Sequence, residues 1–396
     1  MIDIRDKRNC CGCTACLQIC PHNSISMKED EQGFMYPVVN MESCVDCHLC
    51  EKVCPVINQY EGKNSPIHCY LAKTKDDKIR TKSSSGGVFT ELAKYILGKG
   101  GVVFGVLFDE NWQAVYDYTE SEEGLALFRG SKYIQAIPES AYQQVLQFLK
   151  DGRLVLFTGT PCQVSGLNHF LRKWYDNLIT MDVVCHSILS PKVWKLYLKE
   201  KEIEKGQKIS YVSFRDKSLG WTNYSLRIDF EGLDGHNSTI LESHSDNSFM
   251  RGMTYDLFTR PSCSECPARN YKSGSDLTIA DAWDVNKYHP EWNDERGLSH
   301  ILINSQKGYE FFKKITPSID NRKIEYQEVE PFSVHAPLTK SCKPSPYRDE
   351  FYAKIGKGCS VSKTSDCLND RFINKQRMKK TLIYRIVRKI FKCINP

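Results

Sequence analysis

The sequence contains two dense runs of cysteine whose spacing is suited to binding iron–sulfur clusters. Both runs follow the pattern C-x2-C-x2-C-x3-C-P, the first in residues 10–21 and the second in residues 44–55. Three thiolates on one tight loop can bind three irons of a cubane, and the fourth cysteine, after a short helix, binds the other cubane. The spacing therefore predicts two 4Fe–4S clusters, one on Cys10, Cys13, Cys16 and Cys54, and the other on Cys44, Cys47, Cys50 and Cys20.

Zinc is the alternative metal that these cysteines could bind. Structural zinc sites usually pair two C-x2-C knuckles across a longer gap. Here a third cysteine in the same register and a closing proline occur in both runs, which favours clusters over zinc. Cys11 has no place in the pattern, and we interpret it as a bystander thiol at the edge of a cluster.

Four further cysteines could form a third site. Cys162 and Cys185 each follow a short apolar segment, and a strand–helix–strand prediction for residues 154–186 puts both just past the carboxyl ends of parallel strands. Cys263 and Cys266 form a C-x2-C knuckle on a predicted loop. The alternative is that Cys162 and Cys185 are buried apolar thiols. We interpret four cysteines with irregular spacing as ordinary thiols: Cys342, Cys359, Cys367 and Cys393.

Two polar segments are candidate ligand sites. A helix predicted over residues 88–97 begins after a serine- and glycine-rich stretch, and the free N–H groups of a helix N-terminus can bind phosphate. An ordinary helix cap is the alternative. Farther along, a loop between two antiparallel strands predicted in residues 208–232 carries Arg215, Lys217 and Trp221. These residues could hold an anionic or aromatic ligand, or the loop could simply be solvated.

The elements that must position these residues predict a mixed fold, α+β and α/β. The 396 residues, 41% of them hydrophobic, are enough for two or three domains with a real core. We predict a ferredoxin-type (βαβ)2 cluster domain over residues 1–60 and, after a short polar linker, α/β regions over 66–150 and 151–335. A basic tail follows over 336–396. Within the α/β regions, strands at 101–109 and 114–119 form a predicted hairpin, and a helix is predicted over 138–150.

Charge and hydropathy restrict where the protein acts. The net charge is +6, but residues 371–396 alone carry nine Lys or Arg and no acid, so the rest of the chain is mildly acidic and a nucleic-acid partner is disfavoured. We find no apolar run near the ~20 residues of a membrane span and no signal-peptide pattern. We therefore expect a cytoplasmic protein with reduced thiols rather than disulfides.

The basic tail has apolar residues at helical spacing: Leu382, Ile386, Val387 and Ile390. This pattern predicts a basic amphipathic helix that lies on the anionic inner face of a membrane. A helix docked on the body or on a partner, and a disordered tail, are the alternatives.

Seven motifs occur in the order in which a known family has them. After the ferredoxin pair they are KSSSGGVF, RGSKYIQ, LFTGTPCQVSGL, VVCHS, FRDKSLGW and RPSCSECP. From about residue 5 to 335 the chain thus resembles the family of beta subunits of coenzyme F-420-reducing hydrogenase and dehydrogenase.

The resemblance implies an iron–sulfur flavoprotein, with a flavin-binding core that holds FAD beside a third 4Fe–4S cluster. It puts the ligands of that cluster at Cys162, Cys185, Cys263 and Cys266. The flavin phosphate would lie at Ser84, Ser85, Gly86 and Gly87. A stretch near the flavin, where a cation can stabilise the reduced anionic ring, would be Arg129, Gly130, Ser131 and Lys132. Ala280 and Asp284 stand where the family usually has glycines, so F-420 is not carried over as the substrate.

We expect an oxidoreductase that passes electrons between the ferredoxin-type clusters and FAD and exchanges hydride with an organic substrate, a deazaflavin such as F-420 or another reducible compound. Lys132 and His186 are the candidate catalytic residues; His186 could donate a proton, or could be structural. The expected partners are a redox protein or small electron donor and a small-molecule substrate. The alternative is a non-catalytic electron-transfer subunit that serves a separate catalytic partner.

Overall fold

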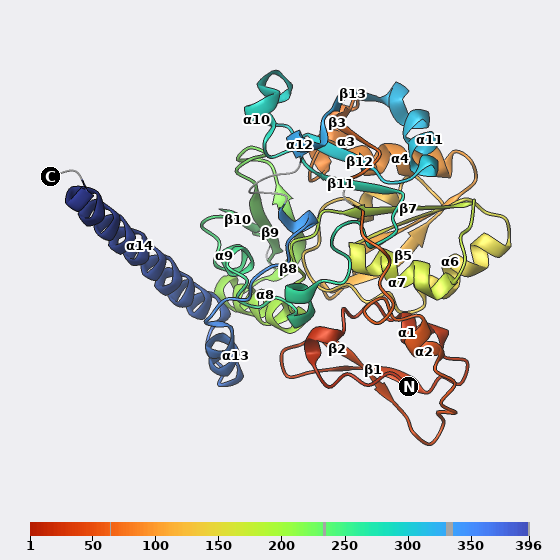
Figure 1. Cartoon of the computed structure of the whole chain (residues 1–396), viewed down its shortest axis with the longest axis horizontal. Coiled ribbons are helices and arrows are strands. Elements are labelled where there is room, and N and C mark those ends of the chain that lie inside the picture. Colours follow the sequence, from red (N-terminus) through yellow and green to blue (C-terminus); the bar gives the residue numbers. More distant parts are fainter. Residues whose placement is uncertain (64, 233–234, 330–335, 395–396) are drawn as a thin grey trace.

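The computed structural model describes residues 1–63, 65–232, 235–329 and 336–394, with side chains up to residue 378. An eight-stranded mixed sheet lies at its centre (Figure 1), in the order β13-β3-β12-β11-β7-β6-β4-β5. Its strands are β3 His68–Thr74, β4 Val102–Phe108, β5 Ala114–Thr119, β6 Val155–Gly159, β7 Leu178–Val183, β11 Leu277–Asp281, β12 Ser299–Ile303 and β13 Ile319–Ile324.

The middle of this sheet is parallel. Strands β4, β6, β7 and β11 pair in parallel, and β4 and β5 form the predicted antiparallel hairpin. Helix α7 (Pro161–Leu171) connects β6 to β7, which confirms the predicted crossover. The apolar residues 155–157 are fully buried, as expected for a parallel strand covered on both faces.

Helices cover both faces of the large sheet. Helices α4 (Val88–Leu97) and α11 (Gln306–Ile315) pack in one apolar core, with Leu92, Ile96 and Phe312 buried against the strands. Helix α6 (Ala141–Lys150) packs with α7 in another core. The predicted helices at 88–97 and 138–150 are confirmed, although α6 begins at Ala141 rather than at Pro138.

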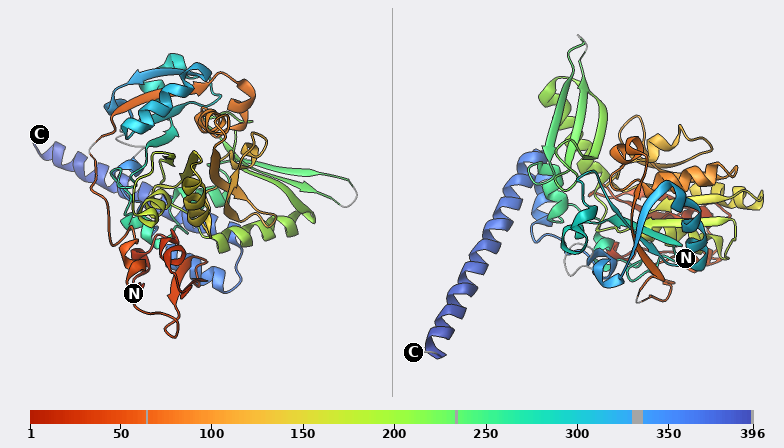
Figure 2. Two further views of the ribbon diagram at one scale, coloured as in Figure 1. Left: turned by 90° about the vertical axis from the view of Figure 1, so that its right-hand side faces the viewer. Right: turned by 90° about the horizontal axis from the view of Figure 1, so that it is seen from above.

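A smaller antiparallel sheet extends from the body (Figure 2). It consists of β8 (Lys208–Asp216), β9 (Ser225–Glu231) and β10 (Ser238–Ser243) in the order β10-β9-β8. Aromatic side chains attach it to α8 (Pro191–Lys205) and α9 (Ser248–Thr254), with Trp194, Phe214 and Phe249 in mutual contact. The two predicted strands are confirmed, and β10 adds a third.

The N-terminal region is simpler than the predicted (βαβ)2 domain. It contains α1 (Ala15–Ile19), the antiparallel hairpin β1 (Ile25–Glu29) and β2 (Met35–Val39), and α2 (Leu49–Lys52). No further strand forms within residues 1–63. The chain before α1 packs against the second cysteine run instead of forming a strand. The Ile2 amide donates to the Cys50 thiol at 3.3 Å, and residues 7–9 form a 3-10 turn.

The C-terminal segment forms two helices, α13 (Arg348–Gly356) and α14 (Val361–Ile394), and α14 projects from the body (Figure 1). Its beginning is anchored, since Leu368 is fully buried and Arg251 pairs with Asp366 and Asp370. The predicted tail helix therefore forms, but the side chains of Leu382, Ile386, Val387 and Ile390 lie outside the described part. None of the helices within the described ranges combines the length and apolarity needed to cross a membrane.

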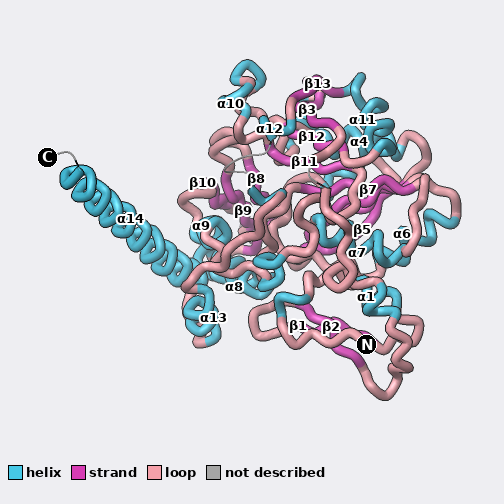
Figure 3. The backbone as a smooth tube through the Cα atoms, in the orientation of Figure 1, coloured by secondary structure: helices cyan, strands magenta, loops and turns pink. Residues whose placement is uncertain are grey.

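Short elements and loops connect these layers (Figure 3). The large sheet takes β3, β4 and β5 from residues 66–150 and its other strands from 151–335. The short helices are α3 Asp77–Lys82, α5 Leu125–Phe128, α10 Val285–Tyr288 and α12 Tyr326–Val329, with 3-10 turns at Lys7–Asn9, Pro261–Glu265, Pro290–Trp292, Thr316–Ser318 and Ala336–Leu338.

Candidate functional site

The first cysteine run lines a hollow of about 340 Å³ together with one cysteine of the second run. Apolar residues complete the lining, among them Ile2, Ile4 and Val56. Burial raises the pKa of the Cys16 thiol, and the neighbouring charges of Cys10 and Cys54 raise it further. Such crowding of thiols is costly unless a positively charged metal group compensates. The cysteines at this hollow are the predicted set, Cys10, Cys13, Cys16 and Cys54, together with Cys11.

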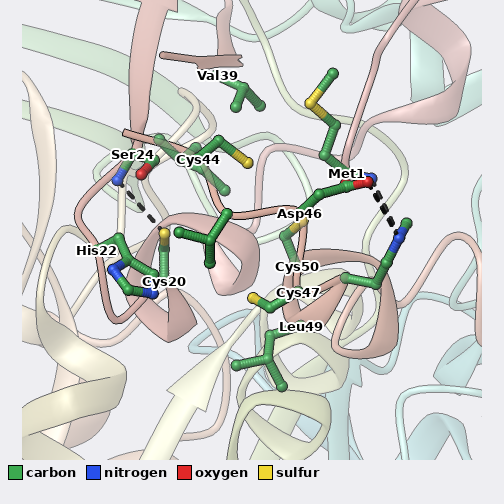
Figure 4. A pocket seen from close by; sticks show the side chains of 13 residues that line it. Met1, Cys20, His22, Ser24, Val39, Cys44, Asp46, Cys47, Leu49 and Cys50 are labelled. Atoms are coloured by element: carbon green, nitrogen blue, oxygen red, sulfur yellow. Dashed lines mark hydrogen bonds and ion pairs between the residues drawn. The ribbon is translucent and has the colours of Figure 1, made fainter. Parts of the chain in front are cut away.

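The second hollow, of about 360 Å³, is the counterpart of the first (Figure 4). The Ser24 amide donates to Cys20 at 3.4 Å, and the Ile2 amide donates to Cys50. Backbone N–H groups aimed at ligand sulfurs stabilise the thiolate form. The cysteines at this hollow are again the predicted set: Cys20, Cys44, Cys47 and Cys50.

The backbone repeats as well as the cysteines. Thr14 and His48 occupy equivalent positions between the second and third cysteines, and both have left-handed φ values, 62° and 58°. Each residue is the N-cap of the short helix that contains the third cysteine of its run and leads to the fourth. The duplication read from the sequence is therefore a duplication of loop conformation.

The donor sets fit a cluster better than a single ion. A zinc ion with Zn–S distances of about 2.3 Å would require four converging sulfurs. Four thiols around an apolar hollow suit a larger group with several irons.

The four core cysteines come together at one edge of the large sheet. Cys162 lies at the start of α7 directly after β6, Cys185 follows β7, and Cys263 and Cys266 lie on or directly after the 3-10 turn Pro261–Glu265. Burial raises the pKa of Cys185, and the charges of Cys162 and Cys266 raise it further. Burial likewise raises the pKa of Cys263, with Cys185 as its first charged neighbour. The four thiols thus share one buried environment.

Two cysteines that we interpreted as bystanders also lie here. Cys11 is 6% exposed and lies in one apolar core with Cys13 and the partly buried Cys162. It therefore lies beside the first hollow, where we expected a thiol at the edge of a cluster, and on the side of the loop that packs against the core. Cys342 is buried, and Cys263 and Cys266 are among the charges that raise its pKa. Only the packing of distant segments reveals either position.

The two stretches predicted near a flavin lie side by side. The Ser131 amide donates to the Ser84 hydroxyl at 2.9 Å, and the two hydroxyls are 3.1 Å apart. Arg129 donates from Nε to the Thr90 hydroxyl at 3.2 Å, in the first turn of α4. The structure thus brings both stretches to the N-terminus of this helix.

The glycines of this helix entry serve packing rather than ligand access. A Cβ on Gly86 would lie 2.4 Å from the Ala72 carbonyl oxygen, and one on Gly87 would lie 2.7 Å from the Thr74 side chain. Both glycines therefore let α4 approach β3. Gly130, with φ +82°, is different because a Cβ there would meet nothing within 4 Å. The Ser85 hydroxyl is already used, donating to the Leu298 carbonyl at 2.6 Å.

The two candidate catalytic residues have different surroundings. Lys132 donates from Nζ to the carbonyls of Leu127 and Arg129, both at 2.8 Å, and burial lowers its pKa to about 7. His186 is nearly half exposed, and its Nε2 lies 2.8 Å from the Asp256 carboxylate. Lys132 can therefore release a proton near neutral pH, whereas His186 is defined by its ion-pair geometry with Asp256.

Arg215, near the end of β8, and Trp221, in the following loop, are buried rather than solvated. Arg215 forms a two-point ion pair with Asp281 at 2.7 and 2.9 Å and donates to the Ser84 carbonyl at 3.1 Å. Trp221 is fully buried, donates to Asp281 at 3.0 Å and stacks on Trp283. The loop thus closes over the serine-rich segment, and its basic and aromatic side chains satisfy one another.

Three segments of the chain match models of known protein families. The N-terminal and C-terminal models of the coenzyme F420 hydrogenase/dehydrogenase beta subunit match residues 69–142 and 152–331, and a 4Fe-4S dicluster domain matches residues 9–58. One subunit of the F(420)H(2) dehydrogenase of Methanosarcina mazei is 27% identical over 173 residues, which are 40% of this chain and 47% of that protein. The matched part thus spans about half of that relative.

Two other similarities extend over most of the chain. An uncharacterized protein of Methanocaldococcus jannaschii is 22% identical over 363 residues, 82% of this chain and 91% of that protein. A chain of the F420-reducing NiFe hydrogenase complex of Methanosarcina barkeri aligns with a TM-score of 0.43 and 15% identity, over 80% of this chain and 94% of that one. With both beta-subunit models behind a 4Fe–4S dicluster domain, the chain belongs to the family of coenzyme F420 hydrogenase/dehydrogenase beta subunits, as an iron–sulfur protein of electron transfer.

Proposed function

We propose that the chain is an iron–sulfur flavoprotein oxidoreductase that passes electrons between its two ferredoxin-type clusters and FAD and exchanges hydride with an organic substrate. The observation that carries this proposal is the apolar core that Cys11, in the dicluster loop, shares with Cys162 at the start of α7. Because electron tunnelling falls steeply with distance, a useful route needs this kind of direct packing. The core thiols Cys162, Cys185, Cys263 and Cys266 would hold the intermediate 4Fe–4S cluster on that route.

The residues around the start of α4 would bind the flavin. Arg129 and the N–H groups of the first turn offer positive charge to a phosphate, and Gly130 leaves open space beside them. FAD, when bound, supplies the conversion between one-electron and two-electron transfer. Lys132 would supply a cation or a proton beside the ring, and the His186–Asp256 pair would hold a proton near the core thiols.

The substrate proposal is F420 or another reducible compound. The name of the Methanosarcina mazei relative supports F420, since that protein belongs to an F(420)H(2) dehydrogenase. Ala280 lies in β11 and Asp284 is the N-cap of α10, so a larger and a charged residue replace the usual glycines near the Arg215–Asp281 pair. We retain the segments 1–60, 66–150, 151–335 and 336–396 as proposed domains, with a redox protein as partner and a cytoplasmic location.

A non-catalytic electron-transfer subunit is the second candidate. It is favoured by the state of the helix entry, where Ser85 and the Gly86 amide are already paired within the protein. The two candidates differ in whether the chain binds flavin and reacts with a substrate of its own.

One experiment tests both candidates. The full chain is purified without oxygen, incubated with FAD, and analysed for iron, sulfide, zinc and flavin. The flavoenzyme should contain about twelve irons, or about eight if the core cluster is absent, with one flavin, and should change the absorbance of F420 when supplied with a chemical reductant. Iron and sulfide without flavin would leave the electron-transfer subunit, and zinc without sulfide would overturn both.

A further inference from the structure

Arg260 is a fully buried cation at the junction of the dicluster loop and the core. Its Nε donates to the Cys10 carbonyl at 2.9 Å and its Nη2 to the Met35 carbonyl at 3.0 Å. Nη1 donates to the Gln135 side chain at 2.9 Å, and Nη2 also lies 3.7 Å from the Cys10 sulfur. The guanidinium thus joins the first cysteine run, the β1–β2 hairpin and the core.

No carboxylate within the described residues forms an ion pair with Arg260. Its contacts are neutral carbonyls, an amide, a thiol and the rings of Tyr36 and Phe34, whose centroids lie 4.3 and 5.5 Å from the guanidinium carbon. A buried charge without a counter-ion costs several kcal/mol. A fold that keeps such a charge needs an anion that the described side chains do not provide.

The sequence makes room for this cation. Gly12 has φ +74°, and a Cβ there would lie 2.4 Å from Gln135 Nε2 and 3.1 Å from the Arg260 guanidinium carbon. A side chain at position 12 would therefore push the guanidinium away from the first run. The Cys-Cys-Gly-Cys motif admits the arginine as well as forming the ligand loop.

The thiols around Arg260 come from both candidate metal centres. Burial alone would lower its pKa, but the charges of Cys10, Cys11 and Cys263, with that of Tyr36, raise it. Cys10 is a proposed ligand of the first ferredoxin-type cluster, and Cys263 is a proposed ligand of the core cluster. Arg260 also immediately precedes the 3-10 turn that carries Cys263.

We propose that Arg260 is a positioning and electrostatic residue for electron transfer, whose buried charge stabilises the more negative, reduced state of the group held by Cys10, Cys13, Cys16 and Cys54. This inference rests on the proposed binding of clusters by these cysteines. Adding one electron to an anionic cluster increases its negative charge, and a fixed cation at 3.7 Å from a ligand sulfur favours that change. The second ferredoxin-type site, held by Cys20, Cys44, Cys47 and Cys50, has no contact with Arg260 and serves as an internal reference.

The test is a reductive titration of the full chain, purified without oxygen and followed by electron paramagnetic resonance, with Arg260→Gln and Arg260→Lys compared with the unchanged protein. Each cluster gives one reduction step, or wave, with its own midpoint potential. In Arg260→Gln, the ratio of reduced to oxidised cluster, measured at the midpoint potential of the unsubstituted protein, should fall at least tenfold for one wave. This corresponds to a midpoint that is lower by about 59 mV for one electron. Another wave should stay unchanged. Arg260→Lys, which keeps the charge, should shift clearly less.

Arg8→Gln is the matched control, because Arg8 spans the same junction to Glu265 at 2.7 Å but is exposed and screened by solvent. It should leave every midpoint unchanged. Unshifted midpoints in Arg260→Gln with full iron content would overturn the inference, as would equal shifts in both Arg260 variants or loss of iron from both. Loss of iron from Arg260→Gln alone would support it, since the charge is then needed to hold the anion. An unchanged protein without iron would instead overturn the proposed function itself.

Discussion

At the residue scale, each cysteine run lends one thiol to the hollow of the other. Cys54 joins the first three cysteines of the first run, and Cys20 joins those of the second. The exchange follows from the short helices α1 and α2, which carry the fourth cysteine of each run away from its loop. The two centres should therefore be lost by crossed substitutions.

Substituting Cys54 with Ser should remove the cluster of the first run, because a serine hydroxyl is a poor ligand for iron at this position. Iron should fall by about four atoms per chain, and the reductive wave sensitive to Arg260 should disappear. Cys20→Ser should remove the other wave. Cys359→Ser, at an exposed thiol, is the control and should leave iron content unchanged. Loss of the same wave in Cys54→Ser and Cys20→Ser would contradict the crossed assignment.

Lys217 should make the free energy of unfolding depend on pH. Its Nζ donates to the carbonyls of Arg80 and Arg296, and burial, with the charges of Arg215 and Arg80, lowers its pKa from 10.5 to about 8. The unfolded chain then binds more protons than the folded one between about pH 8 and 10.5, so the free energy of unfolding should rise with pH across this window.

The rise should be about 1 kcal/mol, because partial exposure of Lys217 screens its charge. It is measured by urea unfolding at a series of pH values. Lys217→Gln should flatten the slope, whereas substitution of the exposed Lys78 should not. An unchanged slope in Lys217→Gln would show that another group is responsible.

Residue spacing predicted which cysteines gather at the two hollows, because each run lies within a short stretch of chain. The core cysteines were grouped instead by the predicted strand order, which puts Cys162 and Cys185 at one edge of the sheet. The same spacing did not reveal that Cys11 packs against the core, and it passed over Arg260. Their roles arise where the dicluster loop meets α7 and the Pro261–Glu265 turn, and such contacts between distant segments leave no local pattern.

At the element scale, helix α7 is the surface on which the dicluster loop rests. A Cβ added to Gly166 would lie 2.7 Å from Cys13 Cβ, 3.0 Å from its sulfur and 2.9 Å from the Tyr142 hydroxyl. An alanine at this position would favour the isolated helix by about 1 kcal/mol, but overpacking against the loop costs about 1–3 kcal/mol. The cost of overpacking should therefore exceed the gain in helix propensity, and Gly166→Ala should destabilise the protein. A stabilising effect would instead mean that the loop does not press on α7.

Gly166→Ala should lower the thermal unfolding temperature and speed the loss of visible cluster absorbance in air, because the loop is displaced from α7. The control is Gly356→Ala in α13, where a Cβ would meet nothing within 4 Å. This substitution should leave the thermal unfolding temperature unchanged or raise it. If both substitutions stabilise the protein, then α7 does not hold the loop this closely.

Element prediction succeeded where the pattern was periodic and bounded. The β6–α7–β7 crossover follows from an apolar strand, a Thr-Pro cap and a second apolar strand. It was less successful in the N-terminal region, where only β1 and β2 form. It also did not reveal that Gly86 and Gly87 are needed for packing, because a glycine needed for packing and a glycine open to a ligand look alike in sequence.

Helix α14 has an anchored beginning and a basic end. Removing residues 379–396 should leave the thermal unfolding temperature unchanged, since the described packing of Leu368 and the pairs of Arg251 lie before this segment. If the tail binds membranes, this truncation should abolish sedimentation with vesicles containing anionic lipid, and high salt should weaken binding by the complete chain. Binding that survives truncation would exclude the tail as the membrane contact.

At the scale of the whole molecule, the dicluster region is built into the core rather than tethered to it. Cys11, Ala15 and Val53 share one apolar core with residues of β4, β6, α6 and α7. The Ser190 hydroxyl donates to the Gln32 carbonyl, and the ring of Tyr60 lies 4.3 Å from that of His169, so the β1–β2 turn and the C-terminal end of the region are attached as well. A shared core implies shared cooperativity.

The protein should therefore lose its clusters and its core in one transition. All six tryptophans lie between residues 112 and 292, so their fluorescence reports on the core, whereas visible absorbance reports on bound clusters. Heating without oxygen at one scan rate should give coincident midpoints for the two signals. In Gly166→Ala, which displaces the loop from α7, absorbance should be lost first, and the two midpoints should separate. Separate midpoints in the unchanged protein would mean that the dicluster region unfolds on its own, and the route from Cys11 to Cys162 would then lack the rigid packing on which electron transfer depends.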